Sequence, residues 1–484
     1  MRPLLLGLVS GLVACGTDPG ETTQPPPDAT PKVTWYQDAA PIVSKHCMSC
    51  HQPGGIGPFS LVDYADAQQN AGLVIQQVTA KTMPPFYASE TPDCTPRFGW
   101  QDDPRLSDQE ISTLNQWVQD GAVAGAVADV PIPPTTALTG VTRTIAPTAA
   151  FTSMGDRDQF MCTLLDPQTG AGYWVTGLQV RPGTADVVHH VVVSEMQAGS
   201  DLDALVAAHG VGTPWDCSNN PTPSGFVMNI WTPGNDPMQA PAGMAIPVTQ
   251  GAMIVMQIHY HPAGGVHAPD ITSIDLRTTL DWPQRMYLIT AFGNAPAAPQ
   301  LLPDPDDRTS SPEFRIPADK ADHVESMQFV VPDLGGLTDV RLYSVNPHMH
   351  LLGTHISGQI QRATPTADQP ASECLQNGDW DFDWQRTFIY NTDASHAPLV
   401  EAGDTLDIQC HWNNTIENPF EQRALEDAGL VAPVDVGLGE GQSTDEMCLE
   451  IFGLSIPAPA EPTSRQVPRL PGALTSLDTR AALR

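Results

Sequence analysis

Basic residues are scarce in this 484-residue chain. It contains 22 Lys and Arg against 55 Asp and Glu, which gives a formal net charge of −33. A chain with so little positive charge has no basic face for a phosphate backbone, so we do not expect nucleic acid as a partner. The acidic balance favours solubility and a cationic partner, and it says nothing about the fold.

Charged and aromatic residues are also few, at 16% and 6%, whereas glycine and proline are frequent, with 39 and 48 residues. This composition is typical of turn-rich β structure rather than of long helical bundles or disorder. At roughly 100–200 residues per domain, the length allows about three domains.

Long apolar runs are missing as well. The apolar stretch near the start, residues 4–9 and 12–14, is too short to span a bilayer, and no later run reaches about 18 apolar residues. We therefore expect no transmembrane helix.

The start of the chain does resemble a bacterial lipoprotein signal. Arg2 precedes the apolar stretch, which ends at Leu12-Val13-Ala14-Cys15-Gly16. The resemblance implies that residues 1–14 are removed and that Cys15 is lipidated, so the protein is exported and anchored at the bacterial cell envelope, on its periplasmic face or at the cell surface. The alternative is a plain secretory signal with an incidental cysteine. Residues 15–32, rich in Thr, Pro and Asp, are predicted to be a flexible tether.

Residues Cys47-Met48-Ser49-Cys50-His51 form the C-x-x-C-H pattern of c-type haem attachment. Two thiols at this spacing can bond to the haem vinyl groups, and His51 can ligate the iron from one side. The second axial ligand is often methionine, and Met83 lies between a lysine–threonine pair and two prolines that hold the chain extended. The alternatives are a thiol redox pair or half a zinc site, with Met83 as an ordinary core residue.

A helix is predicted soon after this motif. Ser107 and Glu110 form a capping box, and Gly121 can end the helix. Four apolar residues fall on one helical face: Ile111, Leu114, Trp117 and Val118.

The haem motif, the proline-flanked methionine and this last helix together resemble a small class I cytochrome c. The resemblance implies an all-α domain over residues 33–125 that carries a haem c. We read His46 as a surface residue and residues 123–136 as a linker.

From about residue 138 the pattern changes to short alternating or apolar runs separated by turn residues. Such runs are typical of antiparallel β-sandwiches, and about 320 residues is enough for two of them. The predicted strands cover residues 172–180, 187–194, 252–260, 326–331, 339–346, 387–390 and 405–411.

Histidines stand on these predicted strands. A pair at i and i+2, such as His348 and His350, points to one face of a strand and can bind one metal. The adjacent pair His189 and His190 points to opposite faces, so joint chelation requires a twist or bulge. Taken singly, each histidine is more often a satisfied polar residue, but three clusters, with His259 in the third, favour metal ligands.

A fourth motif, Asp445-Glu446-Met447-Cys448, follows a Gly-rich loop at residues 437–442. With the motifs around His189, His259 and His348, it resembles the copper type II, ascorbate-dependent monooxygenases of the peptidylglycine α-hydroxylating and dopamine β-hydroxylating type. The four motifs occur in the order of that family over about residues 138–460.

The resemblance implies two jelly-roll-like copper domains, residues 138–308 and 309–460, followed by a tail at 461–484. The first copper, which stores and passes an electron, would be held by His189, His190 and His259, with His261 as an alternative to His259. The second, which meets O₂ and the substrate, would be held by His348, His350 and Met447. Imidazole suits both copper oxidation states, a thioether favours Cu(I), and a methionine ligand argues against zinc.

The resemblance also implies two disulfides, Cys162–Cys217 and Cys410–Cys448, against the alternative of buried free thiols. Cys94 and Cys374 either pair across domains or stay free, and the sequence does not decide between the two.

The reaction implied is hydroxylation of a substrate C–H bond with O₂ and two electrons, on a small molecule or peptide, with the haem as an electron supply that needs its own donor. Peptide amidation is not expected, because Asn346, Leu449 and Ile451 stand where the family holds a peptide carboxylate. The rival hypotheses are a non-catalytic copper- and haem-binding surface lipoprotein, and a haem carrier whose β domains bind no metal.

Overall fold

A computed structural model describes residues 32–53, 55–133, 136–155, 158–218, 226–262, 267–439, 445–464 and 466–467. The predicted signal, Cys15, all but the last residue of the tether and most of the tail lie outside these ranges. Within the described residues, no helix combines the length and apolar character needed to cross a membrane.

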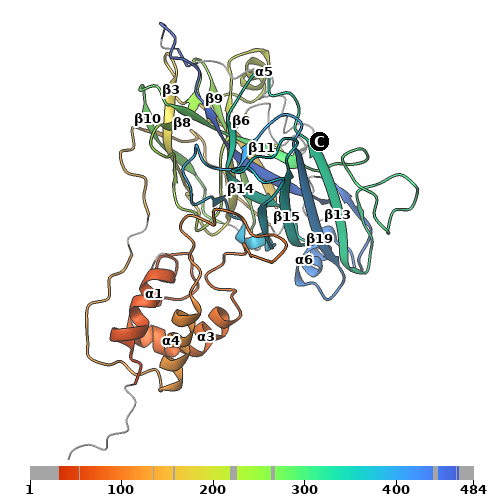
Figure 1. Cartoon of the computed structure of the whole chain (residues 1–484). Coiled ribbons are helices and arrows are strands. Elements are labelled where there is room, and N and C mark those ends of the chain that lie inside the picture. Colours follow the sequence, from red (N-terminus) through yellow and green to blue (C-terminus); the bar gives the residue numbers. More distant parts are fainter. Residues whose placement is uncertain are drawn as a thin grey trace, which may run out of the picture.

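The N-terminal part of the described chain is helical. A short π-helix η1 (Trp35–Ala39) leads into α1 (Ala40–His46), followed by α2 (Tyr64–Gln69), α3 (Ala71–Thr79) and α4 (Asp108–Gln119). Figure 1 shows α1, α3 and α4 gathered at one end of the molecule, away from most of the strands. Their shared core contains Trp35, Val43, Met48, Leu114 and Trp117, all almost fully buried.

Helix α4 begins and ends as its sequence predicts. The Ser107 side chain accepts a hydrogen bond from the Glu110 backbone N–H, and the Glu110 side chain accepts one from the Ser107 backbone N–H. Gly121, just beyond the helix, has a φ of 92°, which glycine adopts without strain. The buried face carries Leu114 and Trp117, so the predicted helix and its capping box are confirmed.

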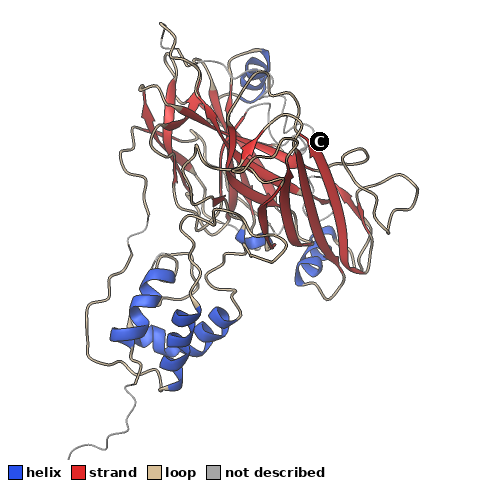
Figure 2. Cartoon of the chain, in the orientation of Figure 1, coloured by secondary structure: helices blue, strands red, loops and turns tan. Residues whose placement is uncertain are grey.

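The rest of the chain is mostly antiparallel β-sheet, as predicted (Figure 2). In its first half, one layer joins β1 (Arg143–Ile145), β10 (Ser273–Thr279), β3 (Tyr173–Arg181), β7 (Met238–Gln239) and β8 (Met244–Val248). The facing layer joins β6 (Phe226–Trp231), β4 (Val188–Met196), β9 (Met253–Tyr260), β2 (Gln159–Leu165) and β5 (Trp215–Asp216). Buried apolar residues from both layers form one core, and helix α5 (Ser200–His209) lies between β4 and β5 in the sequence.

The second half is also a sandwich. One sheet has the order β13 (Lys320–Val330), β19 (Thr405–Asn414), β15 (Gly353–Gln361), β16 (Ser372–Asp379). Its partner sheet contains β11 (Arg285–Gly293), β22 (Leu449–Pro457), β14 (Val340–His348), β17 (Phe388–Ile389) and β18 (Leu399–Val400). Smaller elements are β12 (Arg315–Ile316), η2 (Phe382–Trp384), α6 (Pro419–Ala428), β20 (Val436–Leu438) and β21 (Asp445–Glu446).

One sheet runs through both halves. Strand β11 pairs with β22 along nine residues and with β6 at Ile289 opposite Val227. The sheet therefore crosses the domain boundary predicted at residues 308 and 309. All seven predicted strands are present, with β13 beginning earlier and β17 shorter than expected.

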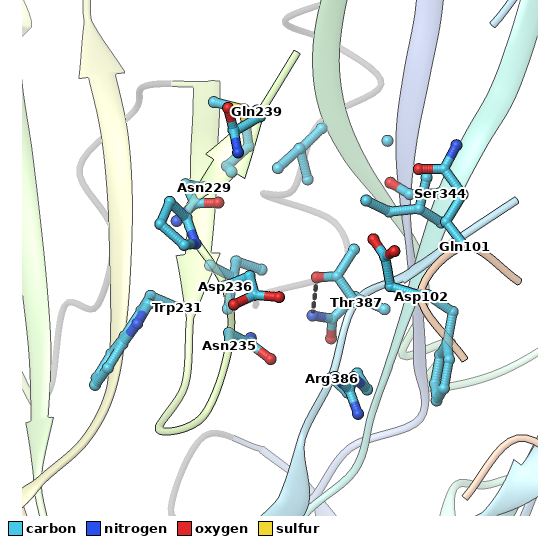
Figure 3. Close-up of a pocket in the computed structure, with 18 of the residues that line it drawn as sticks. Gln101, Asp102, Asn229, Trp231, Asn235, Asp236, Gln239, Ser344, Arg386 and Thr387 are labelled. Atoms are coloured by element: carbon cyan, nitrogen blue, oxygen red, sulfur yellow. Dashed lines mark hydrogen bonds between the residues drawn. The ribbon is translucent and has the colours of Figure 1, made fainter. Parts of the chain in front are cut away.

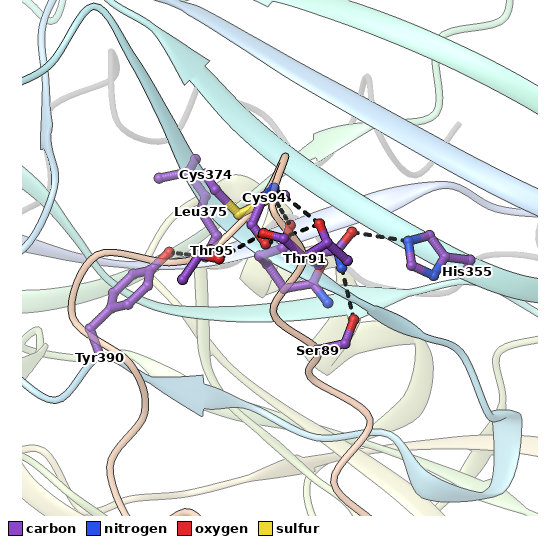
Figure 4. The surroundings of a disulfide bond; sticks show 10 residues. Ser89, Thr91, Cys94, Thr95, His355, Cys374, Leu375 and Tyr390 are labelled. Atoms are coloured by element: carbon purple, nitrogen blue, oxygen red, sulfur yellow. Dashed lines mark hydrogen bonds between the residues drawn. A yellow bond between two sulfur atoms is a disulfide. The ribbon is translucent and has the colours of Figure 1, made fainter.

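A disulfide and backbone pairing tie the chain after the third helix to the second β half. Cys94 is bonded to Cys374 on β16, with a Cα–Cα distance of 5.1 Å (Figure 4). Ala88 forms a β-bridge with Gly378, and the Ser89 N–H donates to the Asn377 carbonyl over 2.8 Å. Of the two alternatives that the sequence left open for Cys94, the structure contains the cross-link.

Candidate metal centres

The first histidine group consists of His189, His190 and His259. Strands β4 and β9 are neighbours, and His190 lies opposite His259 in their register. The register shifts between Val188 and His190, so one extra residue, His189, is accommodated there. This irregularity is the bulge that the sequence requires for an adjacent histidine pair to act together.

The Nδ1 atoms of the first histidine group converge. His190 Nδ1 lies 3.2 Å from His189 Nδ1 and 3.4 Å from His259 Nδ1. Nitrogen ligands about 2.0 Å from a tetrahedral metal are about 3.3 Å apart, so the spacing fits one transition-metal ion. The structure brings together all three predicted residues of this group.

Burial keeps these imidazoles neutral. It holds the pKa of His189 and His190 well below the usual range, with the neighbouring imidazoles adding to the effect, and it also lowers the pKa of His259. Neutral imidazole is the form that ligates a metal. Three neutral nitrogen donors suit copper in both oxidation states.

Asp158 orients His259 and separates it from His261. One carboxylate oxygen of Asp158 lies 2.9 Å from His259 Nε2, without hydrogen-bond alignment, and its negative charge favours the proton on Nε2 and the lone pair on Nδ1. The other oxygen pairs with His261 Nδ1, while Arg423 contacts His261 Nε2 at 3.1 Å. His261 is therefore occupied on both nitrogens and lies outside the first histidine group.

The second histidine group consists of His348, His350 and Met447. His348 ends β14 and His350 follows two residues later, with their rings 5.5 Å apart. The Nδ1 atoms face oxygen acceptors, Gln385 Oε1 at 3.1 Å from His348 and the Asp445 carbonyl at 2.9 Å from His350. Each Nδ1 therefore carries the proton, and each Nε2 lone pair is left for a ligand.

Burial lowers the pKa of His348 to about 4 and that of His350 to about 3. His259 also contributes to lowering both, and His348 contributes to lowering the pKa of His190. The two histidine groups are thus close enough to interact electrostatically.

Glu446 joins Met447 to the histidine pair. Its carboxylate accepts hydrogen bonds from the backbone N–H groups of His350 at 2.9 Å and Leu352 at 2.7 Å, and from Trp412 Nε1 at 3.0 Å. Burial raises the Glu446 pKa to about 7. The Cys410–Cys448 disulfide fixes the chain directly after the buried Met447. Two neutral imidazoles and a thioether are a donor set that fits copper.

A separate cavity of about 260 Å³ lies in the helical part. Cys47, Cys50, His51 and Met83 all line it, and most of the other lining residues are apolar. Cys47 and Cys50 are free thiols, and burial raises the Cys47 pKa to about 12. His51 Nδ1 lies 3.0 Å from the Phe59 carbonyl, which again leaves Nε2 for a ligand. These residues fit a covalently attached haem.

The prediction that His46 is a surface residue is wrong. Its side chain is buried, with Nδ1 2.7 Å from the Pro104 carbonyl and Nε2 3.0 Å from Glu110. The last turn of α1 packs against the start of α4 through His46 and Glu110, which are 64 positions apart. Such a contact leaves no local sequence signal.

The two disulfides implied by the resemblance are both present. Cys162 is bonded to Cys217 and Cys410 to Cys448.

A cavity of about 440 Å³ lies between the two β halves (Figure 3). Ser344 and Asn346 line it from β14, on the strand face that His348 continues. The rest of its lining mixes apolar residues with polar side chains from distant segments, among them Gln101, Asp102, Asn229, Asp236, Tyr287 and Arg386. His348, His350 and Met447 are not among its lining residues, but Asn346 lies two residues before His348, and the volume suits a small organic molecule.

Sequence reasoning missed Asp158, Gln385 and Glu446, which orient the histidines. Glu446 lies in the Asp445–Cys448 motif, but no neighbouring residue indicates its role. The local signal for Gln385 is the unusually aromatic segment that contains it, Trp380-Asp381-Phe382-Asp383-Trp384-Gln385-Arg386, in a chain with few aromatic residues.

A further group that the sequence did not indicate contains Asp304, His323 and Glu325, whose ligand atoms lie within 4.8 Å of one another. Both His323 nitrogens already face carboxylates, Asp306 at 3.2 Å and Glu325 at 3.1 Å. An internal ion pair explains this group without a metal.

No protein-family model and no curated protein matches the chain. Among solved structures, the major capsid protein P2 from bacteriophage PM2 aligns with a TM-score of 0.26 and 9% identity, over 66% of this chain and 98% of that one. A cowpea mosaic virus particle protein aligns with a TM-score of 0.21 and 8% identity, over 63% of this chain and 89% of that one. An allantoicase aligns with a TM-score of 0.14 and 8% identity, over 55% of this chain and 84% of that one. TM-scores this low imply nothing about the activity of this chain.

Proposed function

We propose that this protein is a copper-dependent monooxygenase that hydroxylates a C–H bond of a small molecule with O₂. The observation that carries the proposal is the convergence of three neutral Nδ1 atoms at metal-ligand spacing in the first histidine group, in which His190 and His259 are buried and His189 is partly buried. A second pair of neutral imidazoles, His348 and His350, together with the buried Met447, adds the site at which O₂ and substrate would react.

Each residue has a role in this scheme. His189, His190 and His259 hold the first copper, and Asp158 keeps the His259 lone pair on Nδ1. His348, His350 and Met447 hold the second, and Gln385 and the Asp445 carbonyl keep the two Nε2 atoms free. Bound copper supplies one-electron redox chemistry and O₂ activation. In the overall reaction, R–H, O₂, two electrons and two protons give R–OH and water.

The helical part supplies the electrons in this proposal. Cys47 and Cys50 would attach a haem c there, His51 and Met83 would ligate its iron, and the group would supply one-electron transfer, as the resemblance to a class I cytochrome c implies. In this proposal the protein is an exported lipoprotein anchored through Cys15, and a bound haem would need an electron donor from outside the chain.

The 440 Å³ cavity is the proposed substrate site. Asn346 and Ile451 line it, where the resembling peptide-processing enzymes hold a carboxylate, and neither is cationic. Among the described residues that line it, Asp102 and Asp236 outnumber the one cation, Arg386. A small neutral or cationic substrate therefore fits better than an anionic peptide end.

The test is O₂ consumption by the copper- and haem-loaded protein with ascorbate as reductant, over a panel of small neutral and cationic compounds carrying activated C–H bonds. We expect at least one compound to take up isotope-labelled oxygen, with the product lost in His348→Ala. The matched control is His396→Ala, a mostly exposed histidine outside both groups. Copper bound at full stoichiometry with no labelled product from the panel would favour the non-catalytic electron-transfer protein instead.

A further inference from the structure

One short segment touches all three candidate cofactor sites. Residues 380–386 connect β16 to β17 and include η2. Within seven consecutive residues, side chains of this 380–386 segment reach the haem cavity, the first histidine group and the second histidine group.

The haem side of the contact is made by Trp384. Among the described residues that line the 260 Å³ cavity with Cys47, Cys50 and Met83, it is the one from outside the helical part. The stretch that follows Met83 is held against the same segment. Arg386 Nη1 donates to the Pro85 carbonyl over 3.2 Å, and the Tyr87 hydroxyl donates to Asp381 over 3.1 Å.

The first histidine group is reached by Phe382. Its ring stacks on His189 with centroids 4.9 Å apart and an interplanar angle of 16°. Asp383, the next residue, has a carboxylate oxygen 3.9 Å from His189 Nε2 and is itself held by Arg423 at 3.1 Å. Only one residue separates the stacked ring from Trp384.

The second histidine group is reached by Gln385 and Trp380. Gln385 directly follows Trp384, and its Oε1 accepts from His348 Nδ1 over 3.1 Å. Trp380 lies edge-on to His348 at 5.9 Å and donates from Nε1 to the His350 carbonyl over 2.8 Å. Trp384 therefore stands between a branch to His189 and a branch to His348.

We infer that the 380–386 segment is a branched electron relay, with Trp384 as its entry from the haem. The inference rests on the proposed function, which needs two electrons for each turnover. In each transfer a ferrous haem loses one electron and becomes ferric, and one cupric ion becomes cuprous. The Phe382 branch serves the copper at His189, and the Gln385 branch serves the copper at His348. Each copper is then reduced from the haem without waiting for the other.

The experiment uses the full chain loaded with haem and Cu(II). The haem is reduced by a light pulse, and its reoxidation is followed in the visible spectrum while the loss of the Cu(II) signal is followed by electron paramagnetic resonance. We expect Trp384→Leu to slow reoxidation by about tenfold, which corresponds to about 1.4 kcal/mol of activation free energy. Trp384→Phe should restore most of the rate, which a purely structural role for the indole would not predict.

The two branches are tested separately in variants that each retain only one of the two copper sites. In a His348→Ala background, Phe382→Leu should slow the transfer and Gln385→Leu should not; in a His189→Ala background, the pattern should reverse. The control is Trp215→Leu, which removes a tryptophan stacked on His209 at 4.3 Å in the first β half and should leave every rate unchanged.

The outcomes distinguish the inference from the proposed function. A chain that shows no Cu(II) signal at either group contradicts the proposed function. Normal Cu(II) signals, an intact haem spectrum and unchanged transfer rates in Trp384→Leu, Phe382→Leu and Gln385→Leu overturn the relay and leave the proposed function standing.

Discussion

At the scale of single residues, the candidate centres depend on which imidazole nitrogen carries the proton. Asp158 faces His259 Nε2, whereas Gln385 and the Asp445 carbonyl face the Nδ1 atoms of His348 and His350. The first histidine group therefore presents Nδ1 and the second presents Nε2. The sequence identified the histidines but not these partners, which come from other strands and loops.

Asp158→Asn tests this orientation. The amide can turn its NH₂ toward His259 Nε2, so the electrostatic preference for the proton on Nε2 and the lone pair on Nδ1 is lost. We expect copper affinity at the first histidine group to fall by about 10–100-fold, with the second group unaffected. Copper titration followed by electron paramagnetic resonance measures both.

The control for this change is Asp186→Asn. Asp186 is mostly exposed and lies 3.6 Å from His267, outside both histidine groups. The Asp186→Asn protein should bind copper with the same affinity as the parent protein. An Asp158→Asn protein that also matches the parent would contradict the orienting role.

At the scale of elements, the sequence pattern predicted which segments are strands but not which distant segments contact one another. Alternating runs predicted β4, β9 and β14, and the adjacent pair His189-His190 predicted the need for a bulge, which the β4–β9 register contains. The sequence could not predict that the β21–β22 junction lies against the end of β14. It depends on Glu446 binding backbone N–H groups almost a hundred residues earlier in the chain.

Glu446→Gln tests that junction. An amide cannot accept from all the donors that the carboxylate satisfies, so at least one buried N–H loses its acceptor. We expect the free energy of unfolding to fall by about 1–3 kcal/mol. We also expect weaker copper binding at the second histidine group, with normal binding at the first. Urea unfolding and copper titration measure the two effects.

The matched control is Glu195→Gln, in β4. Glu195 is a fully buried carboxylate that accepts from the Thr249 N–H at 3.1 Å and hydroxyl at 2.7 Å. It should lower stability without selective loss at the second group. If both variants weaken copper at the second group equally, Glu446 acts through stability alone.

At the scale of the whole molecule, what matters is how the helical part meets the β part. The mostly β class of residues 138–460 was predictable because strand periodicity is local. The Cys94–Cys374 cross-link, the sheet shared by both β halves and the docking of residues 84–100 were not, since each joins segments far apart in sequence. The disulfide spans 280 residues, so it restricts where the helical part can sit relative to the sandwiches.

The proposed function requires that one chain carries one haem and two coppers. Its most direct test is the iron and copper content of the protein made in a host that attaches c-type haem. We expect about one iron and two coppers per chain, with one copper lost in His189→Ala and the other in His348→Ala. Iron without copper would contradict the account and leave a haem protein whose buried histidines have another purpose.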